Sequence, residues 1–158
     1  MSPAPMKIID LLNPKYILPD LKANTKRGVL EELAAALVGG QKEVNLQNVV
    51  EVLLERERLG STGIGDNIAI PHGKLPQLSQ MLLAFGRSIK GVDFDSMDGK
   101  ASHLFFLLLA PVNASGLHLK ALAKISRMLM SQTFRDSLMM SGGGEEILQL
   151  IAEKDAEF

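Results

Sequence analysis

The chain has 158 residues with a formal net charge of −1, and 46% of its residues are hydrophobic. This composition is typical of an ordinary globular protein, and the near-neutral charge argues against binding to nucleic acid or to a membrane surface through bulk charge. The absence of cysteine excludes a disulfide scaffold, a thiolate zinc site and a cysteine nucleophile. The longest apolar run, residues 104–110, is too short to span a bilayer.

The two ends of the chain are expected to form short tails around a single domain. Residues 1–5, Met-Ser-Pro-Ala-Pro, lack the charged and apolar segments of a signal peptide, so we expect a cytoplasmic protein. We expect these residues to form a flexible tail, residues 6–153 to form a single domain, and residues 154–158 to form a C-terminal tail. No internal repeat or low-complexity segment divides the domain.

The N-terminal part predicts a short helix or turn over residues 6–12, a short strand over residues 16–18 and then a helix. Asn24 and Thr25 are good helix N-caps because their side chains can accept a hydrogen bond from a free backbone N–H. Apolar residues follow at helical spacing, and the Gly-Gly pair at 39–40 is expected to end the helix.

A second helix is predicted to begin after Asn45, which can also act as an N-cap. Its apolar residues share one face, and it ends in the polar segment 55–58. The helix leads into a glycine-rich loop, residues 60–67, followed by a strand over residues 68–70. A Pro-His-Gly turn at residues 71–73 is expected to close that strand.

The rest of the chain alternates predicted strands with predicted helices. The apolar run 104–109 has no polar alternation, as expected for a strand that is buried on both faces. Asn113 or Ser115 can cap the helix that follows it. A strand is expected over residues 81–89 and a loop over 91–100. Three helices are expected after the apolar run: one over 117–130, one that begins at Thr133 and ends before the glycines at 142–144, and one over 145–152. This alternation predicts one α/β domain, with helices on both sides of a β-sheet.

His72 is the first candidate for chemistry, because imidazole acts as a nucleophile or base near neutral pH. The loop ahead of it offers glycine backbone N–H groups and the hydroxyls of Ser61 and Thr62, which suit an anion. A lone histidine usually has a structural role, but packing alone does not explain its position between Pro71 and Gly73. We therefore predict that His72 does chemistry on a phosphoryl group.

His118 is the second candidate, and two interpretations of it stay open. With Leu122, Ile125 and Leu129 it forms a stripe at helical spacing, which is typical of a core histidine. It also lies in the first turn of its helix, where free N–H groups and the helix dipole favour an anion and a neutral imidazole. A neutral histidine there could donate a hydrogen bond to a phosphoryl group.

Arg56 is the third candidate, at the end of the second helix. Its guanidinium could supply charge to phosphate oxygens. The alternative is a surface ion pair with Glu55 or Glu57, which contributes little stability. Arg58 competes for the same role, and the residues themselves barely separate the two arginines.

Other motifs point away from a metal or a nucleotide. His103 precedes the buried strand and is interpreted as structural. Asp66, Asp95 and Asp98 lie beside glycine or asparagine, where turn chemistry explains them better than a metal site. The loop 60–65 lacks the Gly-Lys-Ser/Thr ending of a Walker A motif and is not G-x-G-x-x-G either, so no nucleotide is expected. No Ser-His-Asp order suggests a catalytic triad.

The candidate residues occur together in one known family. The matching residues are Arg56-Glu57, Ser61-Thr62-Gly63-Ile64-Gly65, Ile68-Ala69-Ile70-Pro71-His72-Gly73 and His118-Leu119. They closely resemble the IIA domain of the mannitol–fructose class (EIIA type 2) of the phosphoenolpyruvate-dependent sugar phosphotransferase system. The resemblance covers residues 8–151 and implies a mixed β-sheet flanked by helices on both sides.

The resemblance also implies roles for individual residues. The phosphorylated histidine of the family's Pro-His motif corresponds to His72, with the phosphoryl group on Nε2, the tele nitrogen. The second active-site histidine corresponds to His118. The active-site arginine, followed directly by glutamate, corresponds to Arg56, which favours it over Arg58.

The mechanism implied is phosphoryl transfer between proteins, in which the protein supplies position and charge stabilisation. Ser61, Thr62 and Gly63 are expected to bind the phosphate, and no metal or cofactor is needed because the phosphoryl group arrives on a protein. The implied donor is an HPr- or NPr-type phosphocarrier protein. Regulatory proteins or a IIB domain are the implied acceptors, with neither nucleic acid nor membrane insertion involved.

Within the family, the run Ile-Gly-Asp-Asn-Ile-Ala-Ile-Pro-His-Gly-Lys-Leu, residues 64–75, resembles the nitrogen-regulatory branch most. A sugar-specific IIA component that passes the phosphoryl group to a IIB domain is the alternative. A binding module whose phosphorylation state is read by partners is also open and is compatible with phosphocarriage. A histidine-dependent phosphatase lacks support, because no residue clearly activates a water.

Overall fold

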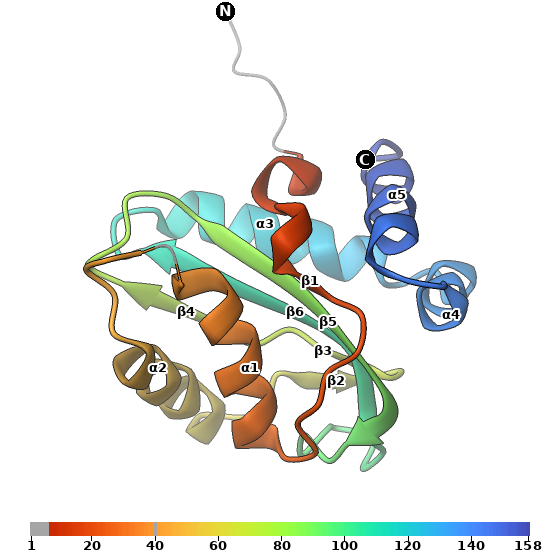
Figure 1. Ribbon diagram of the computed structural model, residues 1–158, viewed down its shortest axis with the longest axis horizontal. Coiled ribbons are helices and arrows are strands. Elements are labelled where there is room, and N and C mark those ends of the chain that lie inside the picture. The colour runs from red at the N-terminus through yellow and green to blue at the C-terminus, as the bar shows by residue number, and fades with distance from the viewer. Residues whose placement is uncertain (1–6, 40) are drawn as a thin grey trace, which may run out of the picture.

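The computed structural model describes residues 7–39 and 41–158. Its framework is a 6-stranded mixed sheet (Figure 1). At the centre, β5 (Leu82–Val92) pairs antiparallel with β6 (Ser102–Pro111). The short strand β1 (Ile17–Leu18) lies parallel to β5 and forms one edge. The predicted α/β class with a single mixed sheet is therefore confirmed.

The opposite side of β6 carries two short strands in line. Strands β3 (Ile68–Ala69) and β4 (His72–Leu75) both pair parallel with β6, and β2 (Gly63–Gly65) pairs antiparallel with β3. Pro71 lies in the interruption between β3 and β4, and its carbonyl accepts a hydrogen bond of 3.0 Å from the backbone N–H of Leu108. Both strands are therefore fixed to the same rigid neighbour.

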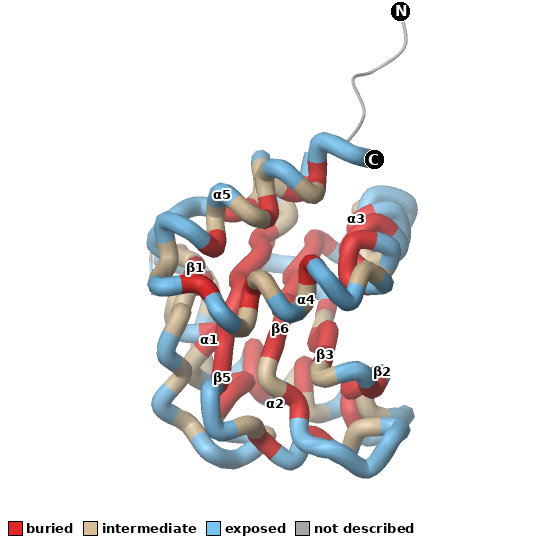
Figure 2. The backbone as a smooth tube through the Cα atoms, turned by 90° about the vertical axis from the view of Figure 1, so that its right-hand side faces the viewer, coloured by how far each residue is buried: buried red, intermediate tan, exposed pale blue. Residues whose placement is uncertain are grey.

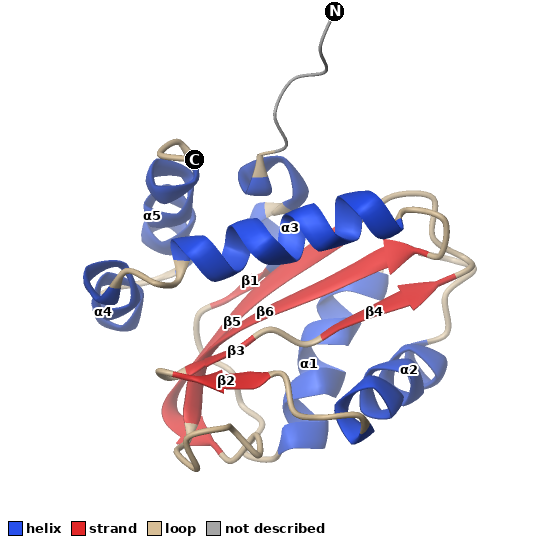
Figure 3. Ribbon diagram, turned by 180° about the vertical axis from the view of Figure 1, so that it is seen from behind, coloured by secondary structure: helices blue, strands red, loops and turns tan. Residues whose placement is uncertain are grey.

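Helices cover both faces of the sheet, as expected (Figure 3). The helices α1 (Lys26–Val38) and α2 (Leu46–Arg58) pack on one face. On the other face lie α3 (Ser115–Met128), α4 (Gln132–Met140), α5 (Gly144–Asp155) and the short 3-10 helix Ile8–Leu11; a second 3-10 helix, Pro14–Tyr16, precedes β1.

Strand β6 divides the hydrophobic core into two. Its side chains alternate: Phe105, Leu107 and Leu109 pack under α1 and α2, and Leu104, Phe106 and Leu108 pack under α3, α4 and α5. All six are fully buried, and Figure 2 shows buried residues running along β5 and β6. The apolar run 104–109 is therefore a strand buried on both faces, as predicted.

Two helix starts follow the predicted capping chemistry. The Thr25 side chain accepts a hydrogen bond from the N–H of Gly28, and the Asn45 side chain accepts one from Asn48. At α3 the expectation was wrong, because Ala114 occupies the N-cap position and no side chain caps the helix. Helix α4 begins at Gln132, one residue before the expected Thr133, with Ser131 as its cap.

The glycine-rich region is more regular than expected. The residues expected to be a Pro-His-Gly turn are not one, because β4 begins at His72. Part of the expected loop is β2, and Asp66 and Asn67 form a tight turn to β3 with φ angles of 53° and 79°. Asp and Asn tolerate this left-handed conformation better than most residues. The turn interpretation of Asp66 is therefore supported.

Helix α5 continues to Asp155, beyond residue 152, where the last helix was expected to end. Asp155 is 2% exposed, pairs with Lys124 at 2.7 Å, and accepts a hydrogen bond of 3.0 Å from the backbone N–H of Ile9. Residues 154 and 155 thus belong to the fold, whereas the expected tail over residues 1–5 lies outside the described residues. None of the helices in the described part of the chain has the length and apolar surface that crossing a bilayer requires.

Candidate functional site

Strand β4 presents its side chains alternately to the two faces of the sheet. His72 and Lys74 face α3, where the Lys74 ammonium donates a hydrogen bond of 2.8 Å to the hydroxyl of Ser115. Gly73 faces α2, and a Cβ there would lie 3.0 Å from Cγ1 of Val52. The absence of a side chain at Gly73 therefore allows α2 to pack closely on β4, and this brings the end of α2 to the His72 ring.

The imidazole of His72 is held through both nitrogens. Nδ1 lies 2.9 Å from the carbonyl oxygen of Ile70, which can only accept a hydrogen bond, so Nδ1 carries the proton. Nε2 receives a hydrogen bond of 3.3 Å from Nε of Arg56. This tautomer leaves the lone pair on Nε2, on the side of the ring that faces the guanidinium.

The arginine that reaches His72 is Arg56. Its Nη1 donates a hydrogen bond of 2.8 Å to the carbonyl oxygen of Gly60, just beyond the end of α2. Arg58 instead pairs with Glu55 on the exposed surface. The structure therefore separates the two arginines that the residues alone left open.

His118 lies in the first turn of α3 and meets the ring of His72. The ring centroids are 5.4 Å apart, and the ring planes are inclined by 62°. His118 is 5% exposed, and its Nε2 is buried without a hydrogen-bond partner among the described residues. A buried polar atom without a partner is unusual in a folded protein and marks a group available to a ligand.

These side chains surround a cavity of about 490 Å³ between α2, β4 and α3. Its wall combines the two histidines and Arg56 with Lys74 and an apolar rim. The lining residues are Val52, Glu55, Arg56, Leu59, His72, Gly73, Lys74, His118, Leu119 and Leu122.

Both site histidines are neutral at pH 7. Burial is the main cause that lowers the pKa of His72 below 6.5; the hydrogen bond to Ile70 and the charge of Glu57 oppose it, and Arg56 and Lys74 act with it. Burial also lowers the pKa of His118, to about 4, with smaller contributions from His72 and Lys74. A neutral imidazole keeps Nε2 of His72 unprotonated, as an acceptor for Arg56, and makes His118 a donor without charge.

Lys74 is a site residue that the sequence reasoning missed. It follows His72 by two positions, so it would face the same side only if residues 72–75 formed a strand. Because a turn was expected there, this signal was overlooked. Lys74 adds a second cation beside Arg56 on the wall of the cavity.

The expected phosphate-binding group of Ser61, Thr62 and Gly63 does not line this cavity. The Ser61 hydroxyl donates to the carbonyl of Phe94 at 2.6 Å and accepts a hydrogen bond of 3.0 Å from the N–H of Gly63. The hydroxyl and the N–H of Thr62 both donate to the carboxylate of Glu57. Their expected role at the phosphate therefore finds no support in these hydrogen bonds.

The remaining polar candidates lie apart from the site. The His103 ring contacts the side chain of Asn67, and Asp98 accepts hydrogen bonds from backbone N–H groups of its own loop and of Asp66. Within residues 7–39 and 41–158, no three His, Asp or Glu side chains are grouped so that they could hold a metal.

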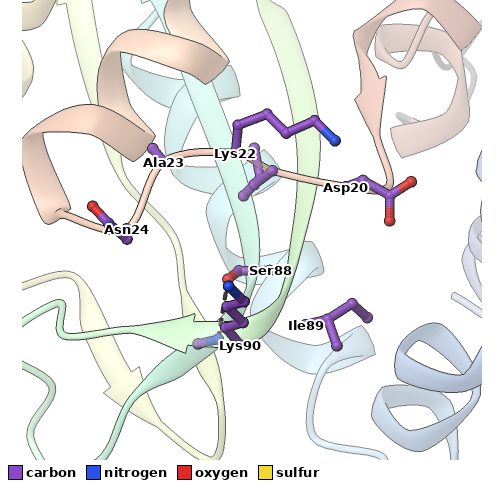
Figure 4. A pocket seen from close by; sticks show the side chains of 9 residues that line it. Asp20, Lys22, Ala23, Asn24, Ser88, Ile89 and Lys90 are labelled. Carbon is purple, nitrogen blue, oxygen red and sulfur yellow. Dashed lines mark hydrogen bonds between the residues drawn. The ribbon is translucent and has the colours of Figure 1, made fainter.

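A second cavity, of about 310 Å³, lies at the far end of β5 and shares no residue with the first. It is lined by residues 20–24 and 88–91. Figure 4 shows Lys22, Lys90 and Asp20 around it, with no histidine among the labelled side chains. Its lining residues include no histidine.

A mixed sheet with helices on both faces, and a cavity that joins a histidine of β4 to an arginine of α2 and a histidine of α3, is the arrangement expected of a IIA-type domain. The chain belongs to the family described as "Phosphoenolpyruvate-dependent sugar phosphotransferase system, EIIA 2", whose model matches residues 10–154. The resemblance seen in the sequence is thereby confirmed.

Related proteins come from two branches. A nitrogen regulatory protein of Bradyrhizobium diazoefficiens is 48% identical over 149 residues, covering 93% of this chain and 95% of that protein. The fructose-specific EIIABC component of Bacillus subtilis is 37% identical over 150 residues, covering 95% of this chain but 24% of that protein. The crystal structure of the nitrogen regulatory protein IIA-Ntr from Neisseria meningitidis matches with a TM-score of 0.85 and 35% identity, covering 91% of this chain and 98% of that one.

Proposed function

We propose that this protein is a phosphocarrier that accepts a phosphoryl group on Nε2 of His72 from an HPr- or NPr-type carrier protein. It then serves a regulatory, nitrogen-related branch of the phosphotransferase system. Family membership supports a phosphotransfer role, and the similarity to nitrogen regulatory proteins supports the branch.

The observation that carries the proposal is the fixed tautomer of His72. The hydrogen bond from Nδ1 to the carbonyl of Ile70 keeps the proton on Nδ1 and leaves the Nε2 lone pair for attack. A structural histidine has no need of an unprotonated nitrogen that, among the described residues, only a guanidinium contacts. Nε2 therefore fits an in-line attack on a phosphorus atom.

In the transfer step, the Nε2 lone pair forms a new P–N bond while the P–N bond to the donor's histidine breaks. The electron pair of the broken bond returns to the donor nitrogen, and the proton on Nδ1 of His72 stays in its hydrogen bond to Ile70. The step needs no external acid or base.

The surrounding cations and donors then stabilise the phosphoryl oxygens. Arg56, whose Nε already lies 3.3 Å from Nε2, turns from the lone pair to the oxygens as the bond forms. Lys74 adds charge from β4, and His118 can direct its unpartnered Nε2–H at an oxygen. This set replaces the phosphate contacts expected from Ser61 and Thr62.

An apolar rim around the cavity suits a transient protein partner. Leu59 and Leu119 are 85% and 67% exposed at the cavity mouth, and Leu117 is exposed in the same turn of α3. A small exposed apolar patch with a charged centre is typical of a weak encounter surface. Donor and acceptor proteins would both dock there.

Intact-mass spectrometry tests the proposal after incubation with phosphoenolpyruvate, enzyme I and an HPr-type carrier. One added, acid-labile phosphate is expected in the wild type and in His103→Ala, a control in a histidine outside the site. None is expected in His72→Ala. Retained labelling of His72→Ala would overturn the site, and no labelling of the wild type with several carriers would overturn the phosphocarrier role.

The second candidate is a sugar-specific IIA component, favoured by the 37% identity to the fructose-specific protein. It shares the chemistry at His72 and differs in the acceptor. Mixing the phosphorylated protein with a fructose-type IIB domain separates the two: fast transfer of the phosphoryl group to IIB would favour the transport role.

A further inference from the structure

A charged cluster at the end of α2 does not line the His72 cavity. We call Lys26, Glu57 and Thr62 the Glu57 cluster. The Glu57 carboxylate accepts hydrogen bonds from the Thr62 N–H, at 3.0 Å, and from the Thr62 hydroxyl, and it pairs with the Lys26 ammonium at 2.9 Å. Lys26 also lies over the ring of Phe94, 4.8 Å from its centroid. Glu57 and Thr62 are 8% and 4% exposed.

One path leads from the Glu57 cluster to Nε2 of His72. The Thr62 hydrogen bonds fold the chain back on the end of α2, where the N–H of Gly60 bonds to the Glu57 carbonyl at 3.1 Å. Gly60 makes this reversal with a φ of 148°, which favours glycine. Its carbonyl then holds Nη1 of Arg56 at 2.8 Å, which leaves Nε of Arg56 directed at His72.

A second path leads from the same cluster to Nδ1 of His72. The Thr62 carbonyl accepts a hydrogen bond of 3.1 Å from the N–H of Ile70. The carbonyl of Ile70 in turn accepts the hydrogen bond of 2.9 Å from Nδ1 of His72. Each ring nitrogen of His72 is therefore connected by a chain of hydrogen bonds to Thr62. Thr62 in turn bonds to the carboxylate of Glu57.

We propose that Glu57 is a positioning residue that fixes both hydrogen bonds of the His72 ring through Thr62. Thr62 then serves the site by bonding to Glu57 rather than to phosphate. Glu57 and Thr62 touch neither the reacting atoms nor the cavity surface, so neither is a catalytic residue. The inference rests on the proposed phosphorylation of His72.

The cluster is better suited to fixing geometry than to adding stability. A buried ion pair often contributes little net stability, because removing two charges from water offsets their attraction. Its hydrogen bonds are directional, however, and small misplacements of a reacting group slow transfer strongly. A positioning role therefore explains why the Glu57 carboxylate is kept here despite the cost of removing it from water.

The central test compares Thr62→Val, which keeps the shape and removes the hydroxyl, with Thr62→Ser, which restores it. Single-turnover phosphorylation by the HPr-type carrier is followed over a range of carrier concentrations. In Thr62→Val the maximal rate is expected to fall about ten- to a hundredfold, with an unchanged half-saturating carrier concentration and complete final phosphorylation. Thr62→Ser is expected to keep nearly the wild-type rate.

Glu57→Gln gives an independent variant, because glutamine keeps an acceptor for Thr62 but loses the charge that pairs with Lys26. An intermediate rate is expected. The matched control is Glu51→Gln on the exposed face of the same helix, where Glu51 pairs only loosely with Arg27 at 3.5 Å. This control is expected to leave the rate unchanged.

A readout in the unphosphorylated protein separates this inference from the proposed function. Proton–nitrogen correlation spectra should detect the Arg56 Nε–H and His72 Nδ1–H protons in the wild type, and both signals should be lost or shifted in Thr62→Val. Unchanged signals, or a rate that falls only with the fraction of folded protein, would overturn the positioning role. Absent phosphorylation of the wild type with the spectral change present would overturn the proposed function instead.

Discussion

His118, on α3, meets His72, on β4, in an edge-type contact with ring centroids 5.4 Å apart. Burial is the main cause that lowers the pKa of both imidazoles, and the proximity of His72 lowers that of His118 further, so both rings favour the neutral form. Positive charge in the site comes from Arg56 and Lys74. The site therefore combines two neutral imidazoles with two cationic side chains on the wall of one cavity.

The neutrality of His118 predicts a pH effect on stability. With its pKa lowered from 6.5 to about 4, the folded protein binds fewer protons than the unfolded chain between these pH values. The contribution of neutral His118 to the free energy of unfolding should therefore be fully present above pH 6.5. It should fall as the pH is lowered toward 4. Urea unfolding across this range measures the slope, and His118→Gln should flatten it. An equal slope in that variant would contradict the prediction.

Replacement of Arg56 by alanine should slow phosphorylation while preserving the fold. The side chain is only partly buried, and its hydrogen bonds join it to His72 and to the carbonyl of Gly60. Loss of one charged donor at a transferring group costs about a hundredfold in rate. Arg58→Ala, which removes an exposed pair with Glu55, serves as the control in the same assay. A collapse of the melting temperature in Arg56→Ala would instead assign it a structural role.

Lys74→Met should raise the pKa of both site histidines. The Lys74 charge is among the causes that lower each of them, so removing it should bring both values closer to 6.5. Burial is the larger cause and persists, so neither value should exceed 6.5. Titration of the imidazole signals by nuclear magnetic resonance measures the shift. Lys90→Met, at the second cavity, should leave both values unchanged.

Substitution of Arg87 should lower the free energy of unfolding strongly without changing the phosphorylation rate. This buried guanidinium, 4% exposed, donates to the carbonyls of Pro19, Leu138 and Ser141 at 3.0, 2.9 and 2.8 Å. Arg87→Met leaves these acceptors unsatisfied and should cost about 3 kcal/mol. Urea denaturation measures this loss, and the phosphorylation rate of the folded fraction should stay at the wild-type value. The exposed Arg27→Met should cost under about 1 kcal/mol.

Local chemistry made the helices and the central strand predictable. Thr25 and Asn45 indicate helix starts, because capping involves residues only three positions apart in the sequence. The run 104–109 indicates a strand buried on both faces, because it lacks polar alternation. Strand β4 was missed because His-Gly-Lys-Leu has no strand pattern of its own. It is a strand because β6 offers it a partner, from His72 opposite Leu108 to Leu75 opposite Pro111.

The candidate site was predictable in its residue types and not in its contacts. His72, His118 and Arg56 were identified from motif and resemblance, and the structure brings all three to one cavity. Ser61 and Thr62 were expected at the phosphate because hydroxyls suit anions. Their partners, the Phe94 carbonyl and Glu57, come from tertiary packing and turns around one helix end, which a motif does not reveal.

The hydrogen bonds that orient the reacting groups end on main-chain carbonyls, those of Ile70 and Gly60. The rim that a partner would meet consists of side chains such as Leu59 and Leu119, which take no part in those hydrogen bonds. In the proposed function, recognition would thus depend on the rim side chains, and the orientation of His72 and Arg56 on the main chain. Substitutions in the rim are therefore expected to change which partner the protein binds. They should leave unchanged the backbone that orients His72 and Arg56 and the phosphoryl chemistry proposed for it.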